Sequence, residues 1–261
     1  MDQSIYNDEL VSVIMPCYNP NSHIKEAIES VLLQTYTNLE LLIIDDGSTE
    51  SVQEFIEDYL IDKRVRFIKQ SRNQGVAITR NIGLQNSKGR YIAFLDSDDL
   101  WFHEKLEQQL ELMKMHQAGL VYSAYEVIRN ASDNVINVIW VPKTIKYRNL
   151  LKNTIIGCLT VLIDREKTGN IKMPVIPVGE DTATWLNILK KGHMAYGIEH
   201  PLAKYRVSGS SLSGNKWNMA KGTWKMYRKT QHLSFFSTGY YFSFYAFNAT
   251  LKRVYKRGNL L

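Results

Sequence analysis

Five aspartates stand directly after two short apolar runs of the sequence, where their carboxylates could act together. They are Asp45, Asp46, Asp96, Asp98 and Asp99. Asp96 and Asp98 flank Ser97, and alternate residues of an extended segment point the same way, so both carboxylates can converge on one ion. Hard oxygen ligands suit Mg²⁺ or Mn²⁺, which prefer few protein carboxylates together with water and phosphate oxygens. A metal held in this way can bridge a diphosphate and stabilise it as a leaving group.

The same residues also have a purely structural interpretation. Asp98 or Asp99 could cap a helix that starts at Leu100, because carboxylates are favourable at helix N-termini. The pattern Asp-x-Asp is common and by itself favours this interpretation. Its position at the end of a buried strand in an alternating α/β pattern reverses the preference. Residues 45–48, Asp-Asp-Gly-Ser, are likewise typical of a tight turn with a helix cap, which is compatible with ligand binding.

The elements that position these aspartates alternate between strand and helix over the first 95 residues. Short apolar runs predict four strands, at 11–15, 39–44, 65–68 and 91–95. Apolar residues at helical spacing predict helices over 23–34, 51–60 and 75–85. This alternation predicts an α/β fold with a mostly parallel, Rossmann-like sheet flanked by helices. Ligands bind at the carboxyl ends of such strands, so the residues that follow each strand are the most informative about function.

Beyond residue 100 the pattern is looser. A helix is predicted over 103–116, and strands at 119–128 and 135–141 are joined by a polar turn and could extend the sheet. A further helix is predicted over 181–190, after a proline-bearing loop. The first ten residues do not form a signal-peptide pattern, and two cysteines are too few for a disulfide framework. A reducing compartment is therefore expected.

Other functional classes find little support. The 261 residues are 44% hydrophobic and 22% charged, which is ordinary for a globular chain. The six histidines are scattered, without metal-ligand spacing. Gly75 and Gly83 do not form a dinucleotide fingerprint, since no Gly-x-Gly-x-x-Gly follows the first strand. Cys17 has no evident histidine partner, and we interpret it as part of a pocket wall.

Four blocks of the sequence stand out in order. They are Val-Ser-Val-Ile-Met-Pro-Cys-Tyr-Asn at 11–19, Leu-Ile-Ile-Asp-Asp-Gly-Ser at 42–48, Asn-Gln-Gly-Val-Ala-Ile-Thr-Arg-Asn-Ile-Gly at 73–83 and Tyr-Ile-Ala-Phe-Leu-Asp-Ser-Asp-Asp at 91–99. Together they closely resemble the family 2 glycosyltransferases, inverting enzymes of the GT-A fold. The resemblance is strong over roughly residues 10–125 and weakens to scattered matches through about residue 212. It implies a GT-A catalytic domain over residues 1–215, with a nucleotide-binding half at about 10–100 and an acceptor half at about 101–215.

The resemblance implies a nucleotide pocket built from the first two blocks. Pro16, Tyr18 and Asn19 line it, with the base packed near Tyr18. Asp45 or Asp46 accepts a hydrogen bond from the base, and Asp46 is preferred because it is nearer the loop. An ionised aspartate is acceptor-only, which suits a uracil N–H.

The third and fourth blocks imply the diphosphate and metal site. Arg80 faces the nucleotide or the diphosphate, whereas without the resemblance a solvated helix arginine is equally acceptable. Asp96 contacts the ribose or the metal, with Ser97 beside it in the nucleotide-sugar site. Asp98 is the main protein ligand of Mn²⁺ or Mg²⁺. Asp99 is either a third acid or a helix cap.

A catalytic base is implied by a later match, Gly-Glu-Asp at 179–181. Inverting transfer is a single in-line displacement, in which the acceptor hydroxyl must lose its proton. Asp181 is assigned as the general base and Glu180 as its neighbour in the acceptor site, although acidic residues are favourable at any helix N-terminus. Trp185 suits sugar stacking or the core, with the core preferred. Arg206 is expected to compensate phosphate charge; the family often has a histidine two residues later, where this chain has Ser208.

The last 61 residues differ from the rest in charge. They carry eleven Lys or Arg and no acidic residue, which leaves 21 basic and 26 acidic side chains in residues 1–200. They also hold 13 aromatic residues, and the stretch 230–251 has the length of a spanning helix but is too polar for one. A basic aromatic helical extension over 216–261 is expected either to contact an anionic membrane surface or to pack on the core or a second copy. Single-stranded nucleic acid is ranked last, and no nucleic-acid partner is expected.

The combined expectation is an inverting, metal-dependent glycosyltransferase. It would move a hexose from a nucleotide-diphosphate sugar, with UDP preferred, to a glycan or a polyprenyl-diphosphate-linked acceptor in bacterial surface polysaccharide assembly. Such an enzyme would work in the cytoplasm, on the inner face of the cell membrane. Two alternatives remain open: a non-catalytic sugar-nucleotide-binding subunit, and a nucleotidyltransferase. No Gly-rich triphosphate loop follows Met15, which argues against the latter.

Overall fold

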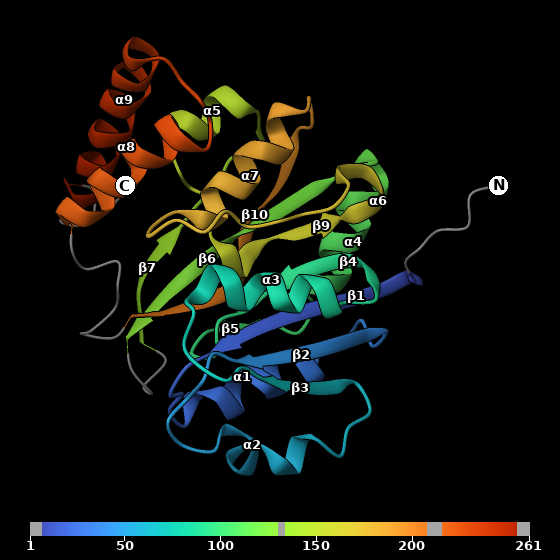
Figure 1. Cartoon of the computed structure of the whole chain (residues 1–261). Coiled ribbons are helices and arrows are strands. Elements are labelled where there is room, and N and C mark those ends of the chain that lie inside the picture. The colour runs from blue at the N-terminus through green and yellow to red at the C-terminus, as the bar shows by residue number, and fades with distance from the viewer. Residues whose placement is uncertain (1–6, 130–133, 208–215, 255–261) are drawn as a thin grey trace.

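A computed structural model describes residues 7–129, 134–207 and 216–254. Within them the strands form a ten-stranded sheet of order β3-β2-β1-β4-β9-β6-β10-β5, with β7 paired to β6 and β8 to β10 (Figure 1). The strands are β1 (Asn7–Cys17), β2 (Leu39–Asp45), β3 (Val65–Lys69), β4 (Gly89–Phe94), β5 (Leu100–Trp101), β6 (Leu120–Arg129), β7 (Asn134–Ile139), β8 (Thr144–Ile145), β9 (Leu162–Asp164) and β10 (Ala195–Val207). The helices are α1 (His23–Leu32), α2 (Val52–Phe55), α3 (Val76–Asn86), α4 (Lys105–His116), α5 (Tyr147–Lys152), α6 (Arg165–Thr168), α7 (Glu180–Lys190), α8 (Lys216–Lys229) and α9 (Phe235–Val254), with 3-10 turns at η1 (Glu57–Tyr59) and η3 (Cys158–Thr160).

The first half of the chain forms the parallel part of the sheet. β1 pairs in parallel with β2 and β4, and β2 with β3, so that the predicted parallel core is confirmed. Alternate residues of β1 point to opposite faces. Val13 joins the core beneath α1 and α4, whereas Ile14 joins the core beneath α3 and α7. The inner strands β1, β2 and β4 are therefore buried on both faces, which explains why their sequences are mostly apolar.

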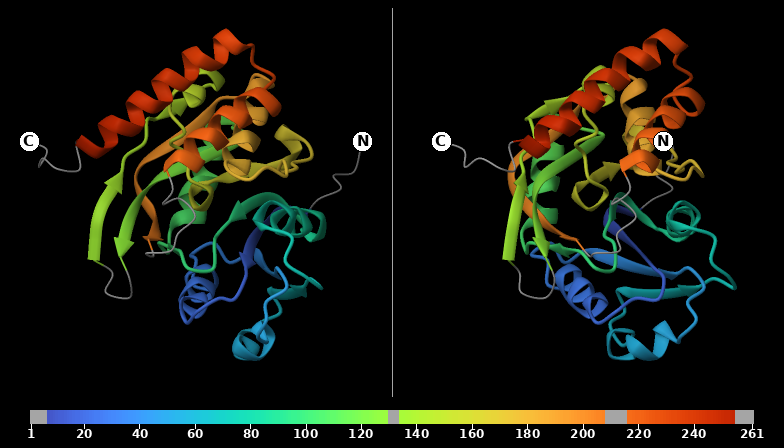
Figure 2. Two further views of the ribbon diagram at one scale, coloured as in Figure 1. Left: turned by 60° about the vertical axis from the view of Figure 1, so that its left-hand side comes forward. Right: turned by 90° about the vertical axis from the view of Figure 1, so that its left-hand side faces the viewer.

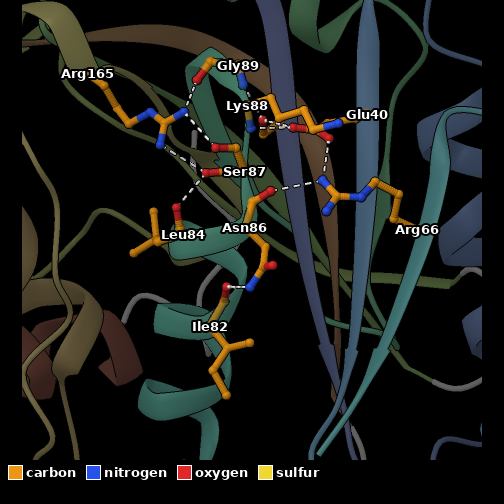
Figure 3. Close-up of polar contacts among 10 residues, drawn as sticks. Glu40, Arg66, Ile82, Leu84, Asn86, Ser87, Lys88, Gly89 and Arg165 are labelled. Carbon is orange, nitrogen blue, oxygen red and sulfur yellow. Dashed lines mark hydrogen bonds and ion pairs between the residues drawn. The ribbon is translucent and has the colours of Figure 1, made fainter. Parts of the chain in front are cut away.

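The turn from α3 into β4 is anchored at the end of the sheet opposite the carboxyl ends of these strands (Figure 3). The buried Glu40 accepts from the backbone N–H of Lys88 at 2.6 Å and from Arg66 at 3.0 Å. Arg165 donates to the Ser87 hydroxyl at 3.0 Å and to the Gly89 carbonyl. These contacts fix where β4 begins, and so where the aspartates that follow it lie.

Most of the predicted elements are confirmed, with small shifts of their ends. The predicted hairpin of 119–128 and 135–141 is present as the antiparallel pair β6–β7, which extends the sheet. The helix predicted over 51–60 is wrong in length: only α2 and the turn η1 form there, although Ser51 does accept a capping hydrogen bond from the N–H of Glu54. The strands β9 and β10 were not predicted. The turn at 130–133 and Ser208 lie outside the described residues.

The two C-terminal helices lie against α5 and α7 rather than projecting away from the sheet (Figure 2). Tyr227 of α8 is fully buried and donates to the Leu151 carbonyl at 2.5 Å. Trp224 packs edge-on against Phe235 and Phe242. The described part of the extension thus shares the hydrophobic core that lies under α7. No helix in the described ranges is long and apolar enough to cross a bilayer.

Candidate functional site

The site begins where the loops after β1 and β2 meet. Cys17 pairs with Asp45 in the parallel register, so both loops leave the sheet side by side. Asn19, with a φ of 44°, donates from its N–H to the Ser48 hydroxyl at 2.8 Å, and its side-chain oxygen accepts from the Thr49 N–H at 2.9 Å. Asparagine tolerates this left-handed backbone better than most residues. Of the residues expected in the pocket wall, Pro16 is buried, whereas Tyr18 is about half exposed and available to a ligand.

The two aspartates after β2 have different surroundings. Asp45 is fully buried, and its Oδ1 accepts from the N–H and the hydroxyl of Ser48 at 2.9 and 2.6 Å. Its Oδ2 has no hydrogen-bond partner among the described residues. Asp46 accepts from the backbone N–H groups of Gln74 and Gly75, both at 2.8 Å. Asp46 therefore ties the β2 loop to the start of α3. Its Oδ2 accepts only the Gly75 bond within the described structure, and a carboxylate oxygen can accept a second.

Arg80 joins three segments that are far apart in the sequence. Its guanidinium is buried and donates to Asp96 at 2.6 Å and to Glu180 at 2.8 Å. Burial alone lowers the pKa of Arg80, but the neighbouring negative charges, first that of Asp96, outweigh burial and hold its pKa well above the ordinary value. The interpretation of Arg80 as a solvated helix arginine is therefore wrong.

The turn after β4 presents the two predicted metal ligands. Asp96 and Asp98 are both partly exposed, and burial together with the charge of Asp96 raises the pKa of Asp98. A bound cation would offset this repulsion, so the two carboxylates fit a divalent ion that takes its other ligands from water and phosphate. No group of three or more His, Cys, Asp or Glu that could hold a metal occurs in the parts of the chain that the structure describes.

Asp99 has a structural role that the sequence did not predict. It is buried, and it accepts from the backbone N–H of Arg206 at 2.8 Å, which ties the turn to β10. Burial, and then the charges of Asp96 and Asp98, raise the pKa of Asp99 well above its ordinary value. The prediction that Asp98 or Asp99 caps a helix is wrong, because the short strand β5 follows and α4 begins only at Lys105.

Arg206 braces the same turn with its side chain. It is buried, donates from Nε to the Asp98 carbonyl at 2.9 Å, and forms an ion pair with Glu26 of α1 at 2.7 Å. These contacts hold the Arg206 guanidinium against the backbone of the turn. The expected compensation of phosphate charge by Arg206 stays a prediction. The sequence did not predict this role for Glu26, because nothing distinguishes it from an ordinary exposed residue of a helix.

The predicted catalytic acids open α7. Gly179 takes a left-handed conformation with a φ of 81° and turns the chain into the helix. Glu180 pairs with Arg80, and Asp181 is partly buried beside it. Burial, followed by the charge of Glu180, raises the pKa of Asp181 to about 6. A carboxylate with such a pKa is ionised at neutral pH and basic enough to accept a proton.

Trp185 does not belong to an acceptor surface. It is fully buried and packs on Phe94, with ring centroids 6.0 Å apart. Its assignment to the acceptor site is therefore corrected, and the preferred core interpretation is confirmed. The sequence did not single out Cys158, at the start of η3, for this site: its thiol is buried, and burial raises its pKa, with the positive charge of Arg80 acting in the opposite direction. No spacing pattern could have revealed it.

The predicted donor-site residues lie at the carboxyl ends of the parallel strands. A cavity of about 370 Å³ lies at the far end of α3 and contains none of the predicted site residues. Its lining is Asn81, Leu84, Gln85, Ser87, Arg165, Asn170, Ile171 and Lys172. The carboxyl ends of the strands, in contrast, carry the residues expected to line the nucleotide pocket and the pair Asp96 and Asp98, next to the buried Arg80.

Solved structures of the same architecture bind nucleotide sugars. Staphylococcus aureus TarS 1–349 in complex with UDP-GlcNAc matches with a TM-score of 0.70 and 17% identity, over 89% of this chain and 70% of that one. The mannosyltransferase PcManGT of Pyrobaculum calidifontis, in complex with GDP-Man and Mn²⁺, matches with a TM-score of 0.64 and 18% identity, over 96% and 76%. At these identities the likeness shows the fold, which is GT-A, as expected from the sequence.

Relatives of known description are much closer in sequence. The chain is 44% identical to TuaG of Bacillus subtilis (strain 168), described as a teichuronic acid biosynthesis glycosyltransferase, over 94% of this chain and 98% of the relative. It is 40% identical to Escherichia coli WfgD, a UDP-Glc:α-D-GlcNAc-diphosphoundecaprenol β-1,3-glucosyltransferase, over 84% and 85%. The family model described as Glycosyl transferase family 2 matches residues 12–166. This chain therefore belongs to glycosyltransferase family 2 and is a glycosyltransferase of bacterial polysaccharide biosynthesis.

Proposed function

We propose that this enzyme transfers a hexose from a UDP-sugar, with inversion, to a glycan carried on a polyprenyl diphosphate. The observation that carries the proposal is the bridge made by Arg80, which links Asp96 to Glu180 at 2.6 and 2.8 Å. The bridge supports the proposal because one buried cation contacts both the turn that carries Asp96 and the residue next to Asp181. Donor and acceptor chemistry would then meet at a single edge of the sheet.

Donor binding would use the loops after β1 and β2. Tyr18 is exposed enough to pack on the base, and Asp46 has an acceptor position left for a uracil N–H. Asp98 and Asp96 would hold Mn²⁺ or Mg²⁺, which supplies positive charge to the diphosphate as the bond to the sugar breaks. The Mn²⁺ complex of PcManGT supports a divalent ion, and the name of WfgD and the UDP-GlcNAc complex of TarS support UDP.

Asp181 would act as the general base. The acceptor hydroxyl attacks the anomeric carbon from the face opposite the leaving UDP, and its proton passes to the Asp181 carboxylate. One displacement of this kind inverts the anomeric configuration. With a pKa of about 6, Asp181 is ionised at neutral pH, while Glu180 stays paired with Arg80 and holds the start of α7.

The acceptor and the setting follow from WfgD, whose name specifies a sugar on diphosphoundecaprenol. An acceptor of that kind would place this enzyme in the cytoplasm, at the inner face of the cell membrane. We also propose that residues 1–215 form the catalytic part and that residues 216–261 form the extension that contacts the membrane. Nucleic acid has no role in this proposal.

The test is UDP binding by calorimetry, with and without Mn²⁺, on the wild type and Asp98→Ala. Metal-dependent binding that the variant loses is expected, with Asp58→Asn as a control of equal charge loss on an exposed site. Product analysis then follows: free UDP indicates glycosyl transfer, whereas pyrophosphate would indicate nucleotidyl transfer. UDP binding that neither metal nor Asp98→Ala affects would overturn the metal assignment. Binding without turnover, unchanged in Asp181→Asn, would support the non-catalytic alternative.

A further inference from the structure

One face of α9 exposes large aromatic side chains in a row. The row consists of Phe236, Tyr240, Phe244 and Phe247, whose exposed fractions are 89%, 53%, 37% and 61%. Their spacing of four, four and three residues puts them on one side of the helix. The opposite side is packed on the protein through Thr238, Tyr241 and Phe242. Exposed aromatic residues that gather in this way mark an interaction surface rather than a solvated helix face.

The helix α8, which packs against α9, carries a row of positive charge. Lys221, Lys225 and Lys229 are exposed and recur every four residues, with the exposed Arg228 next to them. The ammonium group of Lys152, from α5, lies 4.7 Å from the ring centroid of Phe244 and so adds a cation to the aromatic row. No acidic residue follows Glu199 in the sequence. All the charged residues of α8 and α9 are therefore positive.

The same helix contacts the loop in front of the proposed base. Gly222 of α8 lies against Val178, whose Cβ is only 2.6 Å from where a Cβ on Gly222 would be. The methyl group of Met226 lies 3.9 Å from the corresponding point on Gly179. Glu180 and Asp181 follow directly in the chain. Whatever α8 binds is thus one layer of side chains away from the acceptor end of the site.

We propose that the aromatic row of α9 and the basic row of α8 together form a docking face for an anionic lipid bilayer. Aromatic rings at the headgroup level and lysines facing anionic lipid are the combination that binds a helix flat to a membrane. The helices lie on the surface and do not cross it. The consequence for catalysis rests on the proposed function: a polyprenyl-linked acceptor would reach Asp181 along α8 without leaving the membrane.

A second copy of the chain fits this face less well. In a two-fold dimer the same patch meets itself, so the partner would bring no acidic residue of α8 or α9 to pair with the lysines. Anionic lipid supplies the missing negative charge. Each lysine near such a surface contributes about 1 kcal/mol, which is about a fivefold change in partitioning.

The experiment is vesicle flotation of the full chain, with phosphatidylcholine vesicles and with vesicles that also contain phosphatidylglycerol. The aromatic variant combines Phe236→Ser, Tyr240→Ser and Phe247→Ser; its control carries Ile61→Ser, Met115→Ser and Trp140→Ser, which are equally exposed elsewhere. The basic variant combines Lys221→Gln, Lys225→Gln and Lys229→Gln; its control carries Lys63→Gln, Lys69→Gln and Lys88→Gln, all exposed. UDP binding and light scattering accompany each protein.

The wild type and both controls should float with phosphatidylglycerol vesicles and not with phosphatidylcholine alone. The basic variant should partition about a hundredfold more weakly, and added salt should weaken the wild type in the same direction. The aromatic variant should lose binding at any salt. Unchanged flotation of both variants would overturn the docking face. So would a wild-type dimer that the aromatic variant converts to a monomer without lipid. If the wild type does not bind UDP, the proposed function is refuted. The proposal of a docking face is tested separately, by the flotation results.

Discussion

Arg80 and Glu180, one hundred residues apart in the chain, form a 2.8 Å ion pair that closes the site between α3 and α7. The guanidinium also holds Asp96, so both carboxylates depend on one buried side chain. A buried charge with two opposite partners is favourable only while both geometries are kept, since desolvation opposes it. Arg80 is thus the residue whose loss should affect the donor turn and the base helix together.

Arg80→Lys should preserve the charge but not the two-branched geometry, because an ammonium cannot match the fork of a guanidinium. For Arg80→Lys we expect kcat/KM to fall by about a hundredfold or more. Arg80→Met should lower the free energy of unfolding by about 3 kcal/mol, because it leaves both carboxylates without their partner. Steady-state kinetics and thermal unfolding measure the two effects. Arg148→Lys, at an exposed position, is the control. If Arg80→Lys has the kcat/KM of the wild type, a positive charge at residue 80 is sufficient for activity and the two-branched geometry is not required.

Asp181→Asn should abolish most of the transfer rate, by about 10² to 10⁴-fold, because general base catalysis contributes that much. In the wild type the rate should rise as pH increases through about 6 and then level off, since Asp181 must lose its proton to accept another. The residual rate of Asp181→Asn should lack this rise. A rise near pH 6 that persists in the variant would assign the base to another group.

The raised pKa of Asp181 also has a consequence for stability. The Asp181 carboxyl binds its proton more tightly in the folded state than in the unfolded state. Proton binding therefore adds to the free energy of unfolding in full below the pKa of the unfolded state, and this added stability is lost as pH rises through about 6. Asp181→Asn should therefore gain stability relative to the wild type between pH 4 and pH 8. Denaturant unfolding at the two pH values measures the difference, and an equal difference at both would contradict it.

Asp99→Ala should leave the N–H of Arg206 buried without an acceptor, at a cost of about 1–3 kcal/mol. Because the turn between Asp96 and Asp98 would then lose one of its hydrogen bonds to β10 and keep only that from Arg206 Nε to the Asp98 carbonyl, metal-dependent UDP binding should weaken as well. Asp99→Asn keeps an oxygen acceptor for the 2.8 Å bond and should retain most of both properties. If Asp99→Asn loses as much stability and UDP binding as Asp99→Ala, the carboxylate charge rather than the hydrogen bond is required.

Gly222→Ala should push α8 away from the loop at Val178, since the new methyl group would lie 2.6 Å from the valine Cβ. We expect a destabilisation of about 1–3 kcal/mol, typical of overpacking, together with lower activity towards a lipid-linked acceptor. Val178→Gly in the same chain removes that valine Cβ and should restore part of both. Gly239→Ala is the matched control, because no atom lies within 4 Å of its added carbon. It should be neutral or slightly stabilising in the helix.

Trp185→Phe should leave the KM for the acceptor unchanged, because Trp185 is buried against Phe94 and cannot reach a sugar. The lost ring volume should cost about 1–2 kcal/mol, partly offset because the buried indole N–H has no partner among the described residues. Kinetics with varied acceptor and thermal unfolding separate the two roles. A raised acceptor KM at unchanged stability would return Trp185 to the acceptor site.

The local pattern of the sequence was enough to predict β1 to β4 and the helices between them. Buried parallel strands have mostly apolar sequences, and Asp45 and Asp96 can be recognised because they stand at the ends of such segments. The four ordered blocks were enough for the family. These features depend on neighbours in the chain, which is why one sequence reveals them.

Only the tertiary structure decided which side chains meet across long separations. Arg80 pairs with Glu180, Asp99 binds the backbone of Arg206, Arg206 reaches Glu26, and Gly222 packs on Val178. None of these pairs has a periodicity or a spacing, because each depends on where β10, α7 and α8 return to the sheet. The sequence by itself determined the kind of chemistry available; the packing of distant elements determined which charges are paired, which are buried, and which face of the C-terminal helices is left open.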